Sequence, residues 1–473
     1  MHLPHHAWRD EKCSASLCYN PHFASNSLSS NVLGVPGLKR TFSALFVSIL
    51  LAMGLVSCGG YSAPRTTGAS GIPFRIFVSN PFNPTITGAN FPGLDIIDAS
   101  KDVLSFFQVS LLGSVTSAGM MVESPNRDRT VVFSPTTSSS TTNTLAIVDN
   151  AKETATGTVN LPGATESMFV AGNGTTLFAA IPTAAVSGQP SGAIVVVDIS
   201  KPAITATVPV RGAHYLIPSP DGNQVLAVSD SANSVTVFAP AVIGTGTGVG
   251  ALTPVSGTFD RPVWAVFSSD GSTAYVMNCG PQCGGTTASI GVVDMSQTPP
   301  LVTATVPVAA ATMGMLNGGN LYVVGTPLSS GTDCSANLCG VLTVFPEADV
   351  TAAPTTFAVT DGYHNRIVPA PNNQLFIASR TCTDVIATTS TPSRGCLSVF
   401  DTGTGKVYTA ARNGDVTGIQ PIDHRTQVYV CEGGNLQIYD TAQDIGSGNQ
   451  LQLQSTQISI SGQAIDVKLA DFD

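Results

Sequence analysis

Charged residues are scarce in this chain of 473 residues, at 11% of the total. Twenty Lys and Arg stand against thirty Asp and Glu, which gives a net charge of −10. Such an acidic chain lacks the basic surface on which nucleic-acid binding depends, so we expect no nucleic-acid partner. Hydrophobic residues reach 43% and can fill a large core, which excludes wholesale disorder.

Motifs for familiar chemistry are also missing. The sequence contains no Gly-x-Ser-x-Gly elbow, no Walker loop and no dinucleotide fingerprint ahead of a helix. It has no Asp-x-Asp-x-Asp calcium loop and no Cys-x-x-Cys pair for zinc or haem. The sequence therefore predicts no catalytic residue, no metal site and no cofactor.

One long apolar run is present, over residues 41–57, and Lys39 and Arg40 precede it. A basic start, an apolar stretch and a site of small residues form the layout of a secretory signal. The run ends in Leu-Val-Ser-Cys at Cys58, which resembles the lipobox of bacterial lipoproteins. The resemblance implies that residues 39–57 are a lipoprotein signal peptide and that Cys58 is lipidated. An uncleaved anchor helix with an incidental cysteine is the alternative.

The segments on either side of this run add to the prediction of where the protein is located. Residues 1–38 show no periodicity and are interpreted as a disordered upstream extension that follows from a start site placed too early. Residues 58–72 are small and polar, and they predict a flexible tether. Gly59 after the cysteine, by resemblance to other lipoproteins, implies transit to the outer membrane. We therefore expect an exported protein that is held at the cell envelope by a lipid and faces the periplasm or the cell surface.

A short apolar strand that ends in Asp recurs through the rest of the chain, at intervals of about 49 residues. Six copies keep the Asp, and two degenerate copies end before Ala239 and Pro346: the Asp residues are Asp98, Asp149, Asp198, Asp294, Asp401 and Asp440. A second β-rich strand precedes each copy, after a tight turn such as Ser-Pro-Asp-Gly at 219–222. A further strand lies before the turn, and a Thr/Val strand follows the Asp.

Each unit thus holds four strands, and radial repetition of such units makes a β-propeller. Residues 73–473 predict an all-β propeller of eight four-stranded blades, with seven as the alternative count. The first unit lacks an innermost strand, and residues 464–471 match the missing one. We therefore expect the C-terminal strand to close the ring. Two stacked β-sandwiches are the other architecture that the pattern allows.

The turns at 219–222 and 269–271, each followed by an apolar strand, resemble the YVTN repeat of exported bacterial propellers. The resemblance covers the mature chain and is specific only in the fourth and fifth units. It implies a binding or scaffold protein, while a related lactonase-like branch has hydrolytic members.

Seven cysteines follow Cys58, and six form local pairs in the loops between the second and third strands of units five to seven. Export permits disulfides there, and we expect the pairs Cys279 with Cys283, Cys334 with Cys339, and Cys382 with Cys396. A thiolate metal site is the alternative reading. Cys431 is left over at the end of a strand, and a buried thiol is expected.

Polar residues stand just before several inner strands, where a propeller presents its central channel. They are Glu166, Arg211, His214, Arg261, Tyr363, His364 and Arg366. A histidine near arginine and a carboxylate suits either ligand binding or acid-base chemistry. The main hypothesis is a monomeric, lipid-anchored, non-catalytic module that binds an envelope protein, peptide or glycan. The alternative is a lactonase-like hydrolase with its site at the channel mouth.

Overall fold

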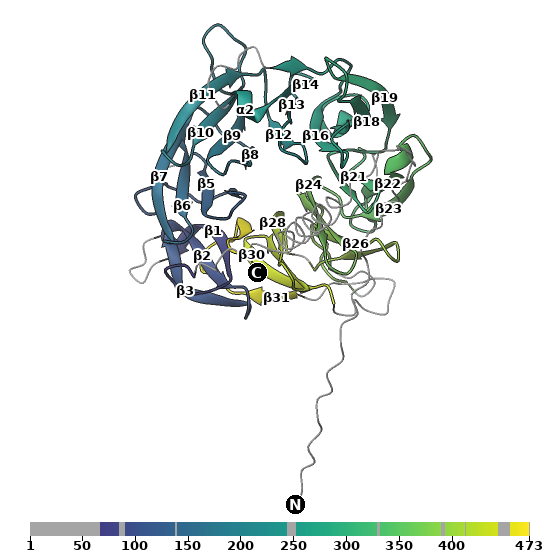
Figure 1. Cartoon of the computed structure of the whole chain (residues 1–473). Coiled ribbons are helices and arrows are strands. Elements are labelled where there is room, and N and C mark those ends of the chain that lie inside the picture. Colours follow the sequence, from purple (N-terminus) through teal and green to yellow (C-terminus); the bar gives the residue numbers. More distant parts are fainter. Residues whose placement is uncertain are drawn as a thin grey trace, which may run out of the picture. The chain divides into compact units, whose positions relative to one another are not determined.

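The computed structural model describes residues 67–84, 90–137, 140–243, 252–328, 332–388, 393–411, 413–442 and 455–472. These residues form a ring of eight four-stranded antiparallel sheets, which confirms the eight-bladed propeller (Figure 1). Within them, no helix has the length and apolar character needed to cross a bilayer. The signal peptide, Cys58 and the extension before them lie outside the described residues and stay predictions.

The strands are given blade by blade, from blade 1 to blade 8. The innermost strands are β32 (Asp466–Leu469), β4 (Met121–Glu123), β8 (Ser167–Val170), β12 (Tyr215–Pro218), β16 (Pro262–Phe267), β20 (Met313–Asn317), β24 (Tyr363–Ala370) and β28 (Val416–Pro421). The second strands are β1 (Arg75–Pro84), β5 (Arg129–Ser134), β9 (Thr176–Ile181), β13 (Val225–Ser229), β17 (Thr273–Asn278), β21 (Asn320–Gly325), β25 (Gln374–Arg380) and β29 (Gln427–Glu432).

The outer half of each blade follows in the same order. The third strands are β2 (Asn90–Asp98), β6 (Asn143–Asp149), β10 (Ala193–Asp198), β14 (Ser234–Phe238), β18 (Ser289–Asp294), β22 (Gly340–Pro346), β26 (Leu397–Asp401) and β30 (Asn435–Asp440). The outermost are β3 (Val103–Ser110), β7 (Thr154–Leu161), β11 (Ala203–Pro209), β15 (Thr253–Pro254), β19 (Leu301–Pro307), β23 (Thr355–Val359), β27 (Lys406–Thr409) and β31 (Ser455–Ile458). Short helical turns are α2 (Pro240–Ile243), η2 (Gly280–Cys283) and η3 (Glu347–Asp349).

Burial explains the composition of the strands. The third strand β10 is buried at all five positions before Asp198, because neighbouring blades cover both of its faces. The outermost strand β19 alternates between exposed and half-buried positions, since only one face meets the protein. A chain of many buried middle strands needs few charges, which accounts for the low charge content.

The recurring Asp at the end of the third strand has a local structural role. Asp198 Oδ1 accepts hydrogen bonds from the Ser200 backbone N–H at 2.9 Å and from its hydroxyl at 2.6 Å. Asp98 with Ser100, and Asp294 with Ser296, repeat this arrangement. The carboxylate thus organises the turn into the outermost strand, as Asx turns do. The repeat is a folding signal and not a row of catalytic acids.

The ring closes in blade 1, as expected from the sequence. Strand β32 pairs antiparallel with β1, with Val78 opposite Val467 and Ile76 opposite Leu469. Both β32 side chains are buried between blade 1 and Tyr429 of blade 8. The last strand therefore joins the first blade to the eighth.

The final residues of the expected tether are packed against the propeller. Gly68 is buried, and the Ser70 backbone N–H and hydroxyl donate to the Glu153 carboxylate at 2.7 and 2.6 Å. Residues 68–70 of the segment expected to be a tether therefore contact the propeller. Glu153 lies in the turn between β6 and β7 of blade 2, so the chain enters the ring at that turn.

Candidate functional site

Antiparallel blades place two kinds of connection at each end of the ring. Links between blades share one end with the loops that join second and third strands, and we name this end the connection face. The first-to-second and third-to-fourth turns lie at the opposite end, the turn face. His214 stands in a link between blades, directly before β12, and therefore belongs to the connection face.

Three side chains meet there in a group that we name the acidic clamp: Glu166, His214 and Asp230. Glu166 comes from the link between blades 2 and 3, and Asp230 directly follows β13 of blade 4. His214 Nδ1 lies 3.1 Å from Asp230 Oδ1, and Nε2 lies 3.6 Å from Glu166 Oε2. Its backbone N–H donates to the Val228 carbonyl at 2.9 Å, which fixes the residue against β13.

The two carboxylates decide the charge of the histidine. Burial alone would lower the pKa of His214, but the hydrogen bonds and charges of Asp230 and Glu166 outweigh it and raise the pKa to about 9. The hydrogen bond with His214 in turn lowers the pKa of Glu166, and that of Asp230 falls for the same reason despite its burial. At neutral pH the clamp is an imidazolium between two carboxylates, with a net charge of −1.

Two phenol groups lie beside the clamp. The Tyr215 ring stacks on His214 with centroids 4.0 Å apart. Burial raises the pKa of Tyr215, and the Tyr363 phenol, a hydrogen-bonding neighbour, adds to the effect. Tyr363 begins β24 of blade 7, so the tyrosines bring blades 4 and 7 together near the axis. Both phenols stay neutral and offer hydroxyl groups to a ligand.

An apolar cavity of about 700 Å³, which we name the chamber, extends from Ile217 and Trp264 to the first-to-second turns at Pro220 and Gly318, and so lies toward the turn face. Trp264 joins the two regions, because its ring lies 6.5 Å from Tyr215, edge to face. The indole N–H donates to the Gly314 carbonyl at 3.1 Å and so leaves the ring as an apolar wall. The main side chains lining the chamber belong to blades 4 to 7: Ile217, Trp264, Phe267, Met313, Met315 and Ile367.

Charged residues occupy inner strands on the other side of the ring. Asp466 of β32 is buried, and its carboxylate accepts the Met121 backbone N–H at 2.8 Å and lies 3.2 Å from Lys468 Nζ. Arg366 Nη2 of blade 7 lies 4.0 Å from the same carboxylate. A Cβ at Gly418 would lie 2.9 Å from Asp466 Oδ1, so glycine lets blade 8 pack against it. This group links blades 7, 8, 1 and 2.

The structure gathers only some of the seven residues that the sequence singled out. Glu166, His214 and Tyr363 belong to one site, and Arg261 lies at its border, with Nη1 3.5 Å from the Asp230 carbonyl. Arg211 is exposed and has no ion pair among the described residues. Arg366 lies in the charged group instead.

His364 is not available to a ligand. It is buried, and its Nε2 lies 2.8 Å from the Thr360 carbonyl. Burial lowers the pKa of His364 to about 4, so the ring is neutral. Adjacent residues of a strand point to opposite faces, and since Tyr363 points toward the clamp, His364 points away from it.

Asp230 and Tyr215 were missed by the sequence reasoning. Tyr215 follows His214 directly, and Asp230 directly follows the second strand, at the same end of the blade. The shared position of these residues, at the same end of blade 4 as His214, could have revealed from the sequence that they belong to this site.

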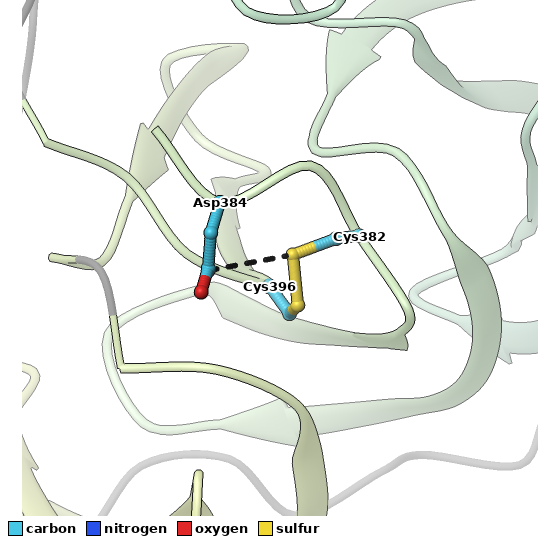
Figure 2. Close-up of side chains that lie close together, drawn as sticks. All are labelled: Cys382, Asp384 and Cys396. Atoms are coloured by element: carbon cyan, nitrogen blue, oxygen red, sulfur yellow. Dashed lines mark hydrogen bonds between the residues drawn. A yellow bond between two sulfur atoms is a disulfide. The ribbon is translucent and has the colours of Figure 1, made fainter. Parts of the chain in front are cut away.

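All three predicted disulfides are present, between Cys279 and Cys283, Cys334 and Cys339, and Cys382 and Cys396. Cys382 and Cys396, together with Asp384, form the described cluster that most resembles a metal site (Figure 2). Because the two sulfurs are bonded to each other, they are not thiolate ligands. Cys431 is buried with a free thiol, and burial raises its pKa well above the usual value.

The sequence matches no family model and no curated protein. Among solved structures, dihydro-heme d1 dehydrogenase NirN in complex with DHE aligns with a TM-score of 0.57 at 12% identity, over 86% of this chain and 77% of that one. The periplasmic gluconolactonase PpgL of Pseudomonas aeruginosa aligns with a TM-score of 0.44 at 14% identity, over 84% and 98%. At such identities the likeness establishes the fold alone: this chain is a β-propeller.

Proposed function

We propose that the chain is an exported, lipid-anchored propeller that binds a peptide segment of an envelope partner without chemical turnover. The observation that carries this proposal is the acidic clamp beside the apolar chamber. The clamp offers negative charge, the two tyrosines beside it offer hydroxyl groups, and the chamber offers room for a large apolar side chain. The expected ligand places such a side chain in the chamber and an ammonium or guanidinium group against Glu166 and Asp230.

The protonation of His214 favours binding over hydrolysis. A general base must accept a proton at the working pH, but an imidazolium with a pKa of about 9 already holds one at neutral pH. Both ring nitrogens also face carboxylates, at 3.1 and 3.6 Å. The clamp therefore resembles a fixed electrostatic surface more than an activated acid-base pair.

The proposed export and membrane attachment are supported by other observations. Three disulfides are typical of proteins that fold outside the reducing cytosol. The apolar run that ends at Cys58 supplies a route of export and an attachment point. A membrane-held propeller with an open connection face would recruit its partner at the envelope.

The chain has only two tryptophans, Trp8 and Trp264, so the Trp8→Phe variant leaves one indole, at the chamber wall. Titration of this variant with Lys-Phe-Lys and Lys-Ala-Lys peptides should give a saturable fluorescence change, at least tenfold tighter with Phe. Met315→Glu should weaken it at least tenfold, whereas Leu301→Ala, on the outermost strand of blade 5, should not. Identical titrations for Met315→Glu would contradict the proposal, as would hydrolysis of δ-gluconolactone that His214→Gln abolishes.

A further inference from the structure

The outermost strand of blade 1 exposes an unusual amount of apolar surface. Phe106 is fully exposed, at 106% of its reference area, and Phe107 is 59% exposed. Val103 and Leu104 at the start of the same strand are exposed as well. Among the described residues, β11 and β19 each carry a single exposed large apolar residue, Ile204 and Leu301. Grouped exposure of this kind indicates an interaction surface.

The two phenylalanines lie in a bulge of β3. Leu104 pairs with Ile97 and Gln108 pairs with Asp95, so residues 105–107 stand opposite Ile96 alone. The Ser105 hydroxyl accepts the Phe107 backbone N–H at 2.9 Å and holds the bulge in shape. Bulged residues leave the ladder, which makes this edge a poor template for another strand. The surface suits insertion of side chains better than pairing of backbones.

The chain enters the propeller at the end of the ring where β3 begins. Ser70 is fixed to Glu153, in the turn between β6 and β7, at the turn face. Strand β3 starts from the equivalent turn of blade 1, after Asp102. Eight residues lie between Cys58 and Thr67, so that stretch spans at most about 30 Å when fully extended. A lipid on Cys58 therefore keeps blades 1 and 2 near the bilayer surface.

The charges near this surface are paired. Lys101 Nζ lies 2.8 Å from Asp98, and Lys152 Nζ lies 3.0 Å from Asp149. Asp102 forms an ion pair with Arg425 at 2.7 Å. A surface of neutral pairs around apolar side chains fits a zwitterionic lipid headgroup layer and does not require anionic lipid.

We propose that Phe106 and Phe107 insert into the membrane that holds the protein, so that the outer rim of blade 1 rests on the bilayer. This inference uses the anchoring part of the proposed function and is independent of the ligand in the chamber. Inserted aromatic side chains add buried apolar area to whatever attachment a lipid on Cys58 provides. Insertion also fixes the orientation of the ring, since the outer rim of blade 1 then faces the lipid.

We name Phe106 and Phe107 the wedge. The test uses the full chain in which Trp8→Phe and Trp264→Phe remove the native tryptophans, and it places one new tryptophan at the wedge. Phe106→Trp, in vesicles of brominated phosphatidylcholine, should be quenched at least twofold more than in unbrominated vesicles. Leu301→Trp, on β19 of blade 5, is the matched control and should show no such quenching. Salt between about 0.05 and 0.5 M should change the quenching little, because salt screens contacts between charges and leaves apolar insertion intact.

The possible outcomes distinguish a failure of membrane insertion by Phe106 and Phe107 from a failure of lipid anchoring at Cys58. Equal quenching at positions 106 and 301, or none at either in membrane-bound protein, overturns the wedge. A Phe106→Ser/Phe107→Ser variant that dissociates a dimer during sedimentation also overturns it, in favour of a second copy as the occupant. If wild-type protein is not lipidated, the anchor fails, and the unlipidated chain with added brominated vesicles still tests position 106 directly.

Discussion

Arg75 and Asp471 form a bidentate ion pair across 396 positions of sequence. Arg75 Nε donates to Asp471 Oδ2 at 2.8 Å, and Nη2 donates to Oδ1 at 2.6 Å. Arg75 is buried, and its Nη1 also contacts Glu153 Oε1 of blade 2 at 2.7 Å. One guanidinium thus ties the first strand to the C-terminal segment and to the second blade.

Arg75→Ala should destabilise the propeller by about 3–5 kcal/mol, because it leaves Glu153 and Asp471 beside a cavity without their cation. Urea denaturation measures the change. Lys152→Ala removes an exposed pair instead and should cost no more than about 1 kcal/mol. Similar losses for both variants would show that Arg75 does not fasten the ring.

Deletion of residues 463–473 removes β32 and should destabilise the entire domain. The inner edge of β1 and the buried faces of Ile76 and Val78 then meet solvent. We expect loss of a cooperative melting transition or aggregation on heating. Phe472→Ala alone, which removes the ring 4.2 Å from the Arg127 guanidinium, is the milder control. A truncated protein that melts at the wild-type temperature would contradict closure by β32.

His214→Gln should reduce stability at pH 6 by about 1–2 kcal/mol, a figure lowered from the full shift because Glu166 is largely exposed. The folded pKa of about 9 lies above the unfolded value of 6.5. The stabilisation is therefore fully present below pH 6.5 and is lost as the pH rises through 9. Wild type and variant should converge near pH 10 in urea denaturation. A difference between wild type and His214→Gln that stays constant with pH would refute the charge assignment.

Replacing Cys382 and Cys396 together by serine should cost about 3 kcal/mol in the chain-entropy model. The sequence separation is 14 for this pair and 4 for Cys279 and Cys283, so the second double variant should lose about 1 kcal/mol less. Denaturation without reductant measures both. An equal or reversed order would indicate that local packing, and not loop closure, sets the contribution of these bonds.

The repeat made most of the fold predictable, because strands, turns and blades recur at a fixed interval and contact only their neighbours. Val467 and Leu469 could be placed for that reason. The candidate site was harder to predict, because Tyr215 and Tyr363 come from blades 4 and 7 and their approach depends on the radius of the ring. The opposite orientation of His364 was available from strand alternation. The contact of Arg75 with Asp471 had no local signal.

The meeting of β1 and β32 also bears on how the protein is made. A chain that is synthesised from its N-terminus presents β1 long before β32 exists. The edge of β1 that carries Ile76 and Val78 then stays unpaired while the other seven blades are synthesised. Contacts so distant in sequence form slowly, and open edges in the meantime attract other strands. The biogenesis of this propeller therefore has a defined vulnerable interval, which ends only when its last strand arrives.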